Sequence, residues 1–216
     1  MIIFDMDGVL TDSEPATIYA CMESLEEWNV KAEFDDFKPY TGMGDDIFIG
    51  KVAEKYGAEY DLKMKARAYE IYCEKAAKRV HVFDWSKPLI LKLKEAGYTL
   101  AVASASDFKK VNCNIECIGV ANETFAAIIT GSDVKNKKPA PDIFLKAAEK
   151  SFLNTKEFVV IEDALSGVKA AKAAGAQCIA LTTSFNREQL KEAGADYITD
   201  DLYDAFEIIQ MILPID

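Results

Sequence analysis

Short apolar segments alternate with helix-forming segments along most of this chain, and this alternation limits the possible folds more than any other feature. The expected strands are nearly continuous apolar runs bounded by polar residues or glycine: residues 1–4, 98–104, 126–130, 158–163, 177–181 and 197–199. Helical patterns separate them, and two of these helices are expected to end at glycines, Gly97 and Gly175. Continuous apolar strands that alternate with helices are typical of a parallel sheet covered on both faces. We therefore predict an α/β fold with a doubly wound parallel sheet.

A long segment with helical patterns and no convincing strand separates the first two expected strands. Helices are expected there at about residues 13–28, 45–56 and 62–78. An all-helical insertion into the α/β domain is the simplest account of this interruption. We predict an α/β core domain made of residues 1–12 and 83–216, and an inserted helical domain made of residues 13–82.

Charge and hydropathy exclude several classes of partner. The 216 residues include 25 lysines and arginines against 36 aspartates and glutamates, which gives a net charge of -11 at pH 7. Such a surface repels polyanions, so we expect neither nucleic acid nor a membrane as a partner. No apolar run is long enough to span a bilayer, and no basic and then apolar leader precedes the first strand. We expect a cytoplasmic protein, and we expect it to be a monomer.

Polar and charged residues follow the expected strands at their carboxyl ends, where open parallel sheets bind ligands. These residues are Asp5 and Asp7 after the first strand, Ser104 after the second, Lys138 after the third, and Glu162 and Asp163 at the end of the fourth. Carboxylates gathered in one small volume repel each other unless a cation lies among them. Oxygen ligands without histidine or cysteine favour a hard ion, and we predict Mg²⁺.

A hydroxyl group and a lysine beside such a metal can bind the oxygens of an anion. Ser104 and Lys138 would supply them, and together with the carboxylates they outline a centre for phosphoryl transfer. Each residue also has a simpler interpretation. Ser104 can cap the helix that follows it, and Lys138 can be one more solvated lysine beside Lys135 and Lys137.

The same residues carry a resemblance to a known family. The segment from Asp5 to Asp12, which reads DMDGVLTD, resembles the first motif of the haloacid dehalogenase superfamily, DxDGxxxD. Ser104 is similar to its second motif, Lys138 in KPAPD to its third, and Glu162-Asp163 to its fourth. The stretch from Glu162 to Gly175 resembles the β-phosphoglucomutase and sugar-phosphatase branch. This resemblance implies that the helical insertion is a small cap domain.

The resemblance also implies a role for each residue. Asp5 would attack phosphorus and become an aspartyl-phosphate, and Asp7 would protonate the leaving alcohol and later deprotonate a water molecule. Mg²⁺ would be held by Asp5, the backbone carbonyl of Asp7, Asp163 and Glu162. The phosphate oxygens would be bound by Ser104, Lys138 and backbone amide groups near Asp5 and Ser104, which are those of Met6, Asp7 and Ala105.

The cap domain is expected to select the substrate. The residues proposed to contact it are Glu14, Gly42, Met43, Gly44 and Asp45. In mutase-type relatives an arginine stands three positions after the glycine that Gly42 matches, and it binds a second phosphate. Asp45 occupies that position here, which favours hydrolysis. We predict a Mg²⁺-dependent phosphatase that acts on a small phosphorylated metabolite, a sugar or polyol phosphate. A β-phosphoglucomutase-like mutase and a non-catalytic binding module are the alternatives.

Overall fold

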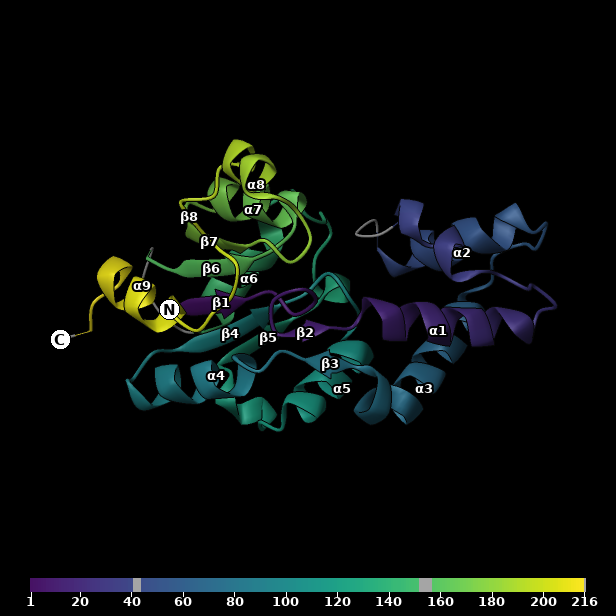
Figure 1. Cartoon of the computed structure of the whole chain (residues 1–216), viewed down its shortest axis with the longest axis horizontal. Coiled ribbons are helices and arrows are strands. Elements are labelled where there is room, and N and C mark those ends of the chain that lie inside the picture. Colours follow the sequence, from purple (N-terminus) through teal and green to yellow (C-terminus); the bar gives the residue numbers. More distant parts are fainter. Residues whose placement is uncertain (41–43, 152–156, 216) are drawn as a thin grey trace. The chain divides into compact units, whose positions relative to one another are not determined.

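The computed structural model of the chain describes residues 1–40, 44–151 and 157–215. The chain divides into two compact units, which are described separately below. The α/β unit comprises Met1–Asp12 and Val82–Asp216, and the helical unit comprises Ser13–His81. Figure 1 shows both units in the colours of the sequence.

A six-stranded parallel sheet forms the centre of the α/β unit, with strand order β5-β4-β1-β6-β7-β8 (Figure 1). The strands are β1 (Ile2–Phe4), β4 (Leu100–Ala103), β5 (Ala127–Ile129), β6 (Val159–Glu162), β7 (Gln177–Leu181) and β8 (Tyr197–Thr199). The N-terminal strand β1 is therefore central. In the register, Phe4 lies opposite Val102 on one side and Ile161 on the other, so the residue after Phe4 emerges between the ends of two neighbouring strands.

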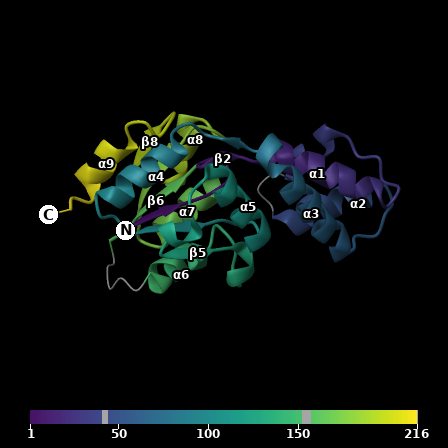
Figure 2. The ribbon, with the colours of Figure 1, turned by 90° about the horizontal axis from the view of Figure 1, so that it is seen from below.

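Helices cover both faces of this sheet because successive strand residues point to opposite faces. Ile2 and Phe4 are buried in one core against α4 (Ser86–Glu95), α5 (Phe108–Ile118) and α9 (Ala205–Ile212). Ile3 is buried in a second core against α6 (Asp142–Lys150), α7 (Leu165–Ala173) and α8 (Arg187–Ala193). Seen from below, α4 lies in front of the strands (Figure 2). The doubly wound parallel sheet that the sequence predicts is confirmed.

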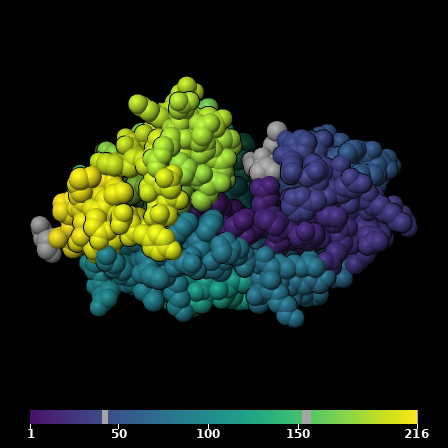
Figure 3. All heavy atoms as spheres, in the orientation of Figure 1, coloured from purple at the N-terminus to yellow at the C-terminus, as the bar shows by residue number. Residues whose placement is uncertain are grey.

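The C-terminal helix α9 packs against α4 on the first of these faces. Lys92 and Glu207 form an ion pair of 3.1 Å between the two helices, and the Tyr98 hydroxyl donates to the Leu213 carbonyl oxygen at 2.8 Å. The two segments touch in the space-filling view (Figure 3). The sequence pattern places the start of this last helix at about Leu202, whereas α9 begins at Ala205.

The helical unit contains α1 (Glu14–Glu26), α2 (Asp45–Lys55) and α3 (Leu62–Arg79), with short 3-10 turns at Phe34–Asp36 and Lys38–Tyr40. Its own core is formed by apolar side chains of the three helices and of the chain between α1 and α2, among them Leu25, Phe37, Val52 and Met64. The buried Ser24 hydroxyl donates to the Met64 carbonyl oxygen at 2.7 Å and ties α1 to α3.

Two very short strands depart from the sequence-based expectation. β2 (Thr11–Asp12) and β3 (His81–Val82) form a two-stranded sheet where the chain leaves the α/β unit and returns to it. The expectation that residues 13–82 contain no strand is therefore wrong at His81–Val82. A strand of two residues has no readable periodicity, because it forms through pairing with a distant segment and not through its own pattern. Within the described ranges, no helix combines the length and the apolar composition needed to cross a bilayer.

Candidate active site

Asp5 stands at the carboxyl end of the central strand. Its backbone N–H donates to the Ile161 carbonyl oxygen at 2.9 Å, which extends the pairing of β1 with β6 by one residue. Its side chain is only 9% exposed. The carboxylate is therefore held in place by the sheet and largely removed from solvent.

Lys138 reaches the same point from the loop that follows β5. Its ammonium group lies 2.5 Å from the Asp5 carboxylate and 2.6 Å from the Glu162 carboxylate. The Lys138 side chain is only 8% exposed, whereas Lys135 and Lys137 are exposed residues. The interpretation of Lys138 as one more solvated lysine is therefore wrong.

The two acidic residues that end β6 are oriented by different partners. The Glu162 carboxylate accepts hydrogen bonds from the backbone N–H groups of Asp163 and Ala164, both at 2.8 Å. The Asp163 carboxylate accepts one from the Ser184 hydroxyl and lies 3.4 Å from the Thr183 hydroxyl, on the loop after β7. Asp5, Glu162 and Asp163 are all buried. Sequence analysis did not identify Thr183 and Ser184, since two hydroxyl residues in a loop after a strand carry no distinctive signal.

Glycine is required at two positions beside these carboxylates. Gly8 has a φ of +82°, and a Cβ atom there would overlap the Asp163 carboxylate. A Cβ atom at Gly167, in the first turn of α7, would overlap the Glu162 carboxylate. The carboxylates thus fill the space that a side chain would need.

We expect Gly167→Ala to impair turnover more than it impairs folding. The added methyl group has to displace Glu162 from Lys138, so kcat is expected to fall by about 10-fold or more. Gly175→Ala is the matched control. Gly175 has a φ of +79° and open space where a Cβ atom would lie, so alanine there should cost stability, about 1 kcal/mol, and leave kcat unchanged. Equal kcat values for both variants would contradict this prediction.

Negative charge is in excess at this site. The carboxylates of Asp5, Glu162 and Asp163 are buried together, and Lys138 is the one cation that forms ion pairs with any of them in the described part of the chain. Two negative charges are therefore uncompensated when all four groups are ionised. Burial raises the pKa of Asp5 to about 7 and the pKa of Asp163 well above its ordinary value. Burial alone would lower the pKa of Lys138, but the adjacent carboxylates of Asp5 and Glu162 raise it above that of an ordinary lysine.

These groups fit a hard divalent cation in charge and in donor chemistry. All the side-chain donors are carboxylate oxygens, and two extra positive charges would balance the site. In the described part of the chain, no group of three or more acidic, histidine or cysteine side chains already converges as a metal site. Asp5 and Glu162 instead contact Lys138. Each of these contacts uses one carboxylate oxygen, Oδ1 of Asp5 and Oε1 of Glu162.

Asp7 lies two residues beyond Asp5 and has a different set of partners. Its carboxylate accepts a hydrogen bond from the Ser106 hydroxyl at 3.2 Å, and the Lys110 ammonium lies 3.3 Å away. Asn114 donates to the same carboxylate at 3.4 Å. Sequence analysis missed these three residues, although their signal is present. They recur at intervals of four. Ser106 precedes α5, while Lys110 and Asn114 share one face of that helix, where a polar stripe replaces the expected apolar one.

Ser104 is buried directly after β4 and does not cap a helix. Its backbone N–H donates to the Ile129 carbonyl oxygen at 3.0 Å, and its side-chain oxygen accepts from the Ser106 N–H at 3.2 Å. The residue at the N-cap of α5 is Asp107, so the capping interpretation of Ser104 is wrong. Ala105 is exposed, while the Met6 side chain is buried in the core, which leaves only its backbone to serve a ligand.

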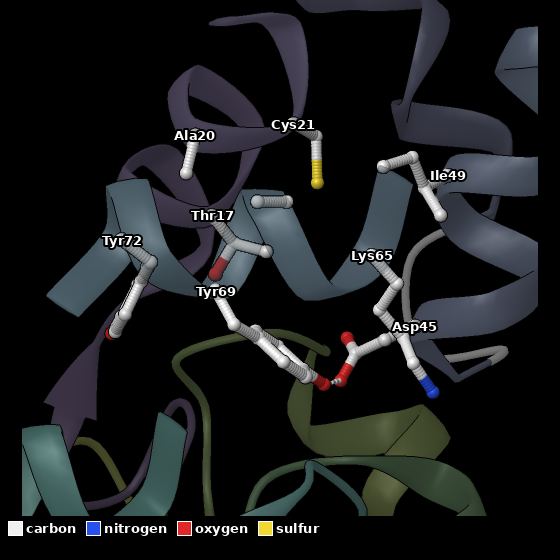
Figure 4. Close-up of a pocket in the computed structure, with 9 residues that line it drawn as sticks. Thr17, Ala20, Cys21, Asp45, Ile49, Lys65, Tyr69 and Tyr72 are labelled. Atoms are coloured by element: carbon white, nitrogen blue, oxygen red, sulfur yellow. Dashed lines mark hydrogen bonds between the residues drawn. The ribbon is translucent and has the colours of Figure 1, made fainter. Parts of the chain in front are cut away.

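The residues proposed to contact the substrate belong to the helical unit. Glu14 is exposed at the start of α1, Gly44 is exposed before α2, and Gly42 and Met43 lie outside the described residues. Asp45 begins α2, and its carboxylate accepts a hydrogen bond from the Tyr69 hydroxyl. Asp45 and Tyr69 line a small pocket of this unit, together with Lys65 (Figure 4).

Comparisons with known proteins found relatives that match nearly the whole of this chain. The chain is 28% identical over 218 residues to phosphoglycolate phosphatase of Vibrio cholerae, which covers 97% of this chain and 96% of that protein. It is 42% identical over 206 residues to the chloroplastic protein SUPPRESSOR OF QUENCHING 1 of Arabidopsis thaliana, covering 93% of this chain but only 19% of the plant protein. The crystal structure of CbbY from Rhodobacter sphaeroides in complex with phosphate has a TM-score of 0.79 at 26% identity, covering 93% of each chain.

A protein-family model matches most of the chain. Residues 2–181 match the model of the haloacid dehalogenase-like hydrolases, and this segment includes Asp5, Ser104, Lys138 and Asp163. The resemblance inferred from the four sequence motifs is confirmed, and the chain belongs to the haloacid dehalogenase-like hydrolase family.

Proposed function

We propose that this protein is a Mg²⁺-dependent phosphatase that hydrolyses a small phosphorylated metabolite through an aspartyl-phosphate on Asp5. One observation carries the proposal. A buried carboxylate at the end of the central strand is held 2.5 Å from a buried lysine, beside the two further buried carboxylates of Glu162 and Asp163. A carboxylate in that position can act as a nucleophile, and the lysine can bind the negatively charged group that it attacks.

In the first step an Asp5 oxygen attacks phosphorus, and the bond from phosphorus to the alcohol oxygen breaks. Asp7 donates a proton to that departing oxygen, since an alkoxide is a poor leaving group. Lys138, the Ser104 hydroxyl and the backbone amides of Met6, Asp7 and Ala105 bind the phosphoryl oxygens in this proposal. The Lys138 ammonium offsets the charge that would otherwise repel the nucleophile.

In the second step Asp7 accepts a proton from a water molecule, whose oxygen attacks the phosphorus of the aspartyl-phosphate. The bond between phosphorus and the Asp5 oxygen breaks, which releases inorganic phosphate and restores the carboxylate. Asp7 can serve both steps because the proton it gives in the first is regained in the second.

The metal site of this proposal is formed by Asp5, Asp163, the backbone carbonyl of Asp7 and Glu162. A bound Mg²⁺ would neutralise charge on the nucleophile and on the phosphoryl group. The excess of negative charge among the buried carboxylates supports this assignment, and so does the absence of softer ligands from the residues that gather there.

A sugar or polyol phosphate is the proposed substrate class. Two relatives support a small phosphate ester as substrate: the Vibrio cholerae enzyme named phosphoglycolate phosphatase and the CbbY protein crystallised with phosphate. Hydrolysis is favoured over phosphoryl transfer within a sugar, because Asp45 would repel a second phosphate at the position where mutase-type relatives have an arginine.

A screen of phosphate esters tests the proposal. Purified protein is incubated with sugar phosphates, polyol phosphates and 2-phosphoglycolate in the presence of MgCl₂, and released phosphate is measured. We expect release from at least one ester, and its loss in EDTA with recovery on adding excess Mg²⁺. Folded protein that releases phosphate from no ester would refute the phosphatase. Conversion of β-glucose 1-phosphate to glucose 6-phosphate without free phosphate would identify a mutase.

A further inference from the structure

The residues around Asp7 form a cluster that the proposed mechanism does not use. Ser106 precedes α5, while Lys110 and Asn114 lie on successive turns of that helix. The Lys110 ammonium is 3.2 Å from the Ser106 hydroxyl and 3.3 Å from the Asp7 carboxylate. The Asn114 amide donates to the Asp7 carboxylate at 3.4 Å and to the Thr11 hydroxyl at 3.3 Å.

Burying the polar groups of this cluster costs free energy unless other polar groups contact them. The Lys110 side chain is 6% exposed, and Asn114 is fully buried. Other residues of the same helix, such as Val111 and Ile115, are buried in the apolar core. A lysine and an asparagine in such surroundings lose hydration, and partners have to replace it. Asp7 supplies that replacement, although its own side chain is 32% exposed and can reach a ligand.

We propose that Lys110, Asn114 and Ser106 are positioning residues for the Asp7 carboxylate, which rests on the proposed role of Asp7 as proton donor. Lys110 and Asn114 contact one carboxylate oxygen, and the Ser106 hydroxyl contacts the other. Contacts to both oxygens restrict rotation of the side chain. Asn114 also links the carboxylate to the Thr11 hydroxyl. The Thr11 carbonyl oxygen accepts the Gly8 N–H at 2.7 Å, so the Asp7 side chain is fixed relative to the turn that follows it.

Positioning matters only when the leaving group needs a proton. Transfer from a well-placed acid contributes about 10² to 10⁴-fold for a poor leaving group. An alkyl phosphate requires this proton, whereas 4-nitrophenyl phosphate releases a stable phenolate without it. The ratio of kcat/KM for the two esters therefore reports the placement of Asp7. It reflects only the steps up to departure of the alcohol, so the later attack of water does not affect it.

The test compares Lys110→Met and Ser106→Ala with the control Lys109→Met, an exposed lysine of the same helix. The substrates are 4-nitrophenyl phosphate and the sugar phosphate that the wild type hydrolyses best. We expect each test variant to lose about 10-fold to 100-fold in kcat/KM on the sugar phosphate and less than about 3-fold on 4-nitrophenyl phosphate. The control is expected to match the wild type on both.

A second comparison separates positioning from general structural support. In the Asp7→Asn background, Lys110→Met is expected to cause no further loss on the sugar phosphate, because a residue that acts through Asp7 has no effect without it. Equal losses on both esters, unchanged rates, or additive losses in the double variant would each overturn the positioning role. A wild type that is folded but inactive on every ester would overturn the proposed function itself, and the positioning role with it.

Discussion

Replacing Asp5 by asparagine is expected to lower kcat for phosphate ester hydrolysis by about 10⁴-fold or more. The amide is nearly the same size as the carboxylate but is a far weaker nucleophile, so no aspartyl-phosphate can form. Mass spectrometry after rapid acid quenching measures this directly. The wild type should show a phosphoryl adduct during turnover, and the variant should show none.

Stability distinguishes this loss from misfolding. Asp5 and Glu162 share Lys138, and the Asp163 carboxylate is buried beside them, so removing the charge of Asp5 lessens the repulsion among the three carboxylates. We expect the thermal midpoint of Asp5→Asn, measured in EDTA, to equal or exceed that of the wild type. Asp84→Asn, at an exposed position of the same unit, serves as the control and should retain full activity. An Asp5→Asn variant with wild-type kcat would disprove the nucleophilic role.

Replacing Lys138 by methionine is expected to affect both activity and stability. Methionine keeps the length of the side chain but removes the only cation that forms ion pairs with Asp5 and Glu162 among the described residues. Breaking a buried ion pair on one side typically lowers the free energy of unfolding by about 3–5 kcal/mol. Loss of the charge that binds the phosphoryl group should lower kcat by about 10³-fold.

Urea denaturation measures the loss of unfolding free energy in Lys138→Met, and it should be run both in EDTA and in excess Mg²⁺. If a cation binds among these carboxylates, Mg²⁺ should stabilise Lys138→Met more than it stabilises the wild type, because the variant has one more uncompensated charge. Lys135→Met, at an exposed lysine of the same loop, is the control. If the methionine variant does not fold, Lys138→Arg, which retains the charge, is measured in its place. Wild-type stability and kcat in Lys138→Met would contradict the role of this ion pair.

Most of the α/β architecture could be predicted because its determinants are local. Runs such as residues 158–161 are apolar and bounded by polar residues, and helices such as Arg187–Ala193 end at a glycine that adopts a left-handed conformation. The two-residue strands at Thr11–Asp12 and His81–Val82 could not be predicted in this way, since they depend on pairing between segments far apart in the sequence.

In the candidate site, too, some features could be predicted from the sequence and others could not. Its acidic residues and Lys138 could be identified from their positions after expected strands, because parallel strands bring their carboxyl ends to one edge. Their contacts could not. Ser184 approaches Asp163 from a loop after β7, and no residue pattern in that loop indicates which carboxylate it will meet.

The sequence by itself determined the order of strands and helices, the long helical insertion and the motifs that place this chain in its family, since each depends on hydrophobic period or on short residue patterns. Only the tertiary structure decided which charges meet. It placed Lys138 between Asp5 and Glu162, and it directed Lys110 and Asn114 toward Asp7 instead of solvent. The physical reason is that the direction of a side chain depends on helix packing and loop path, which distant parts of the chain set together.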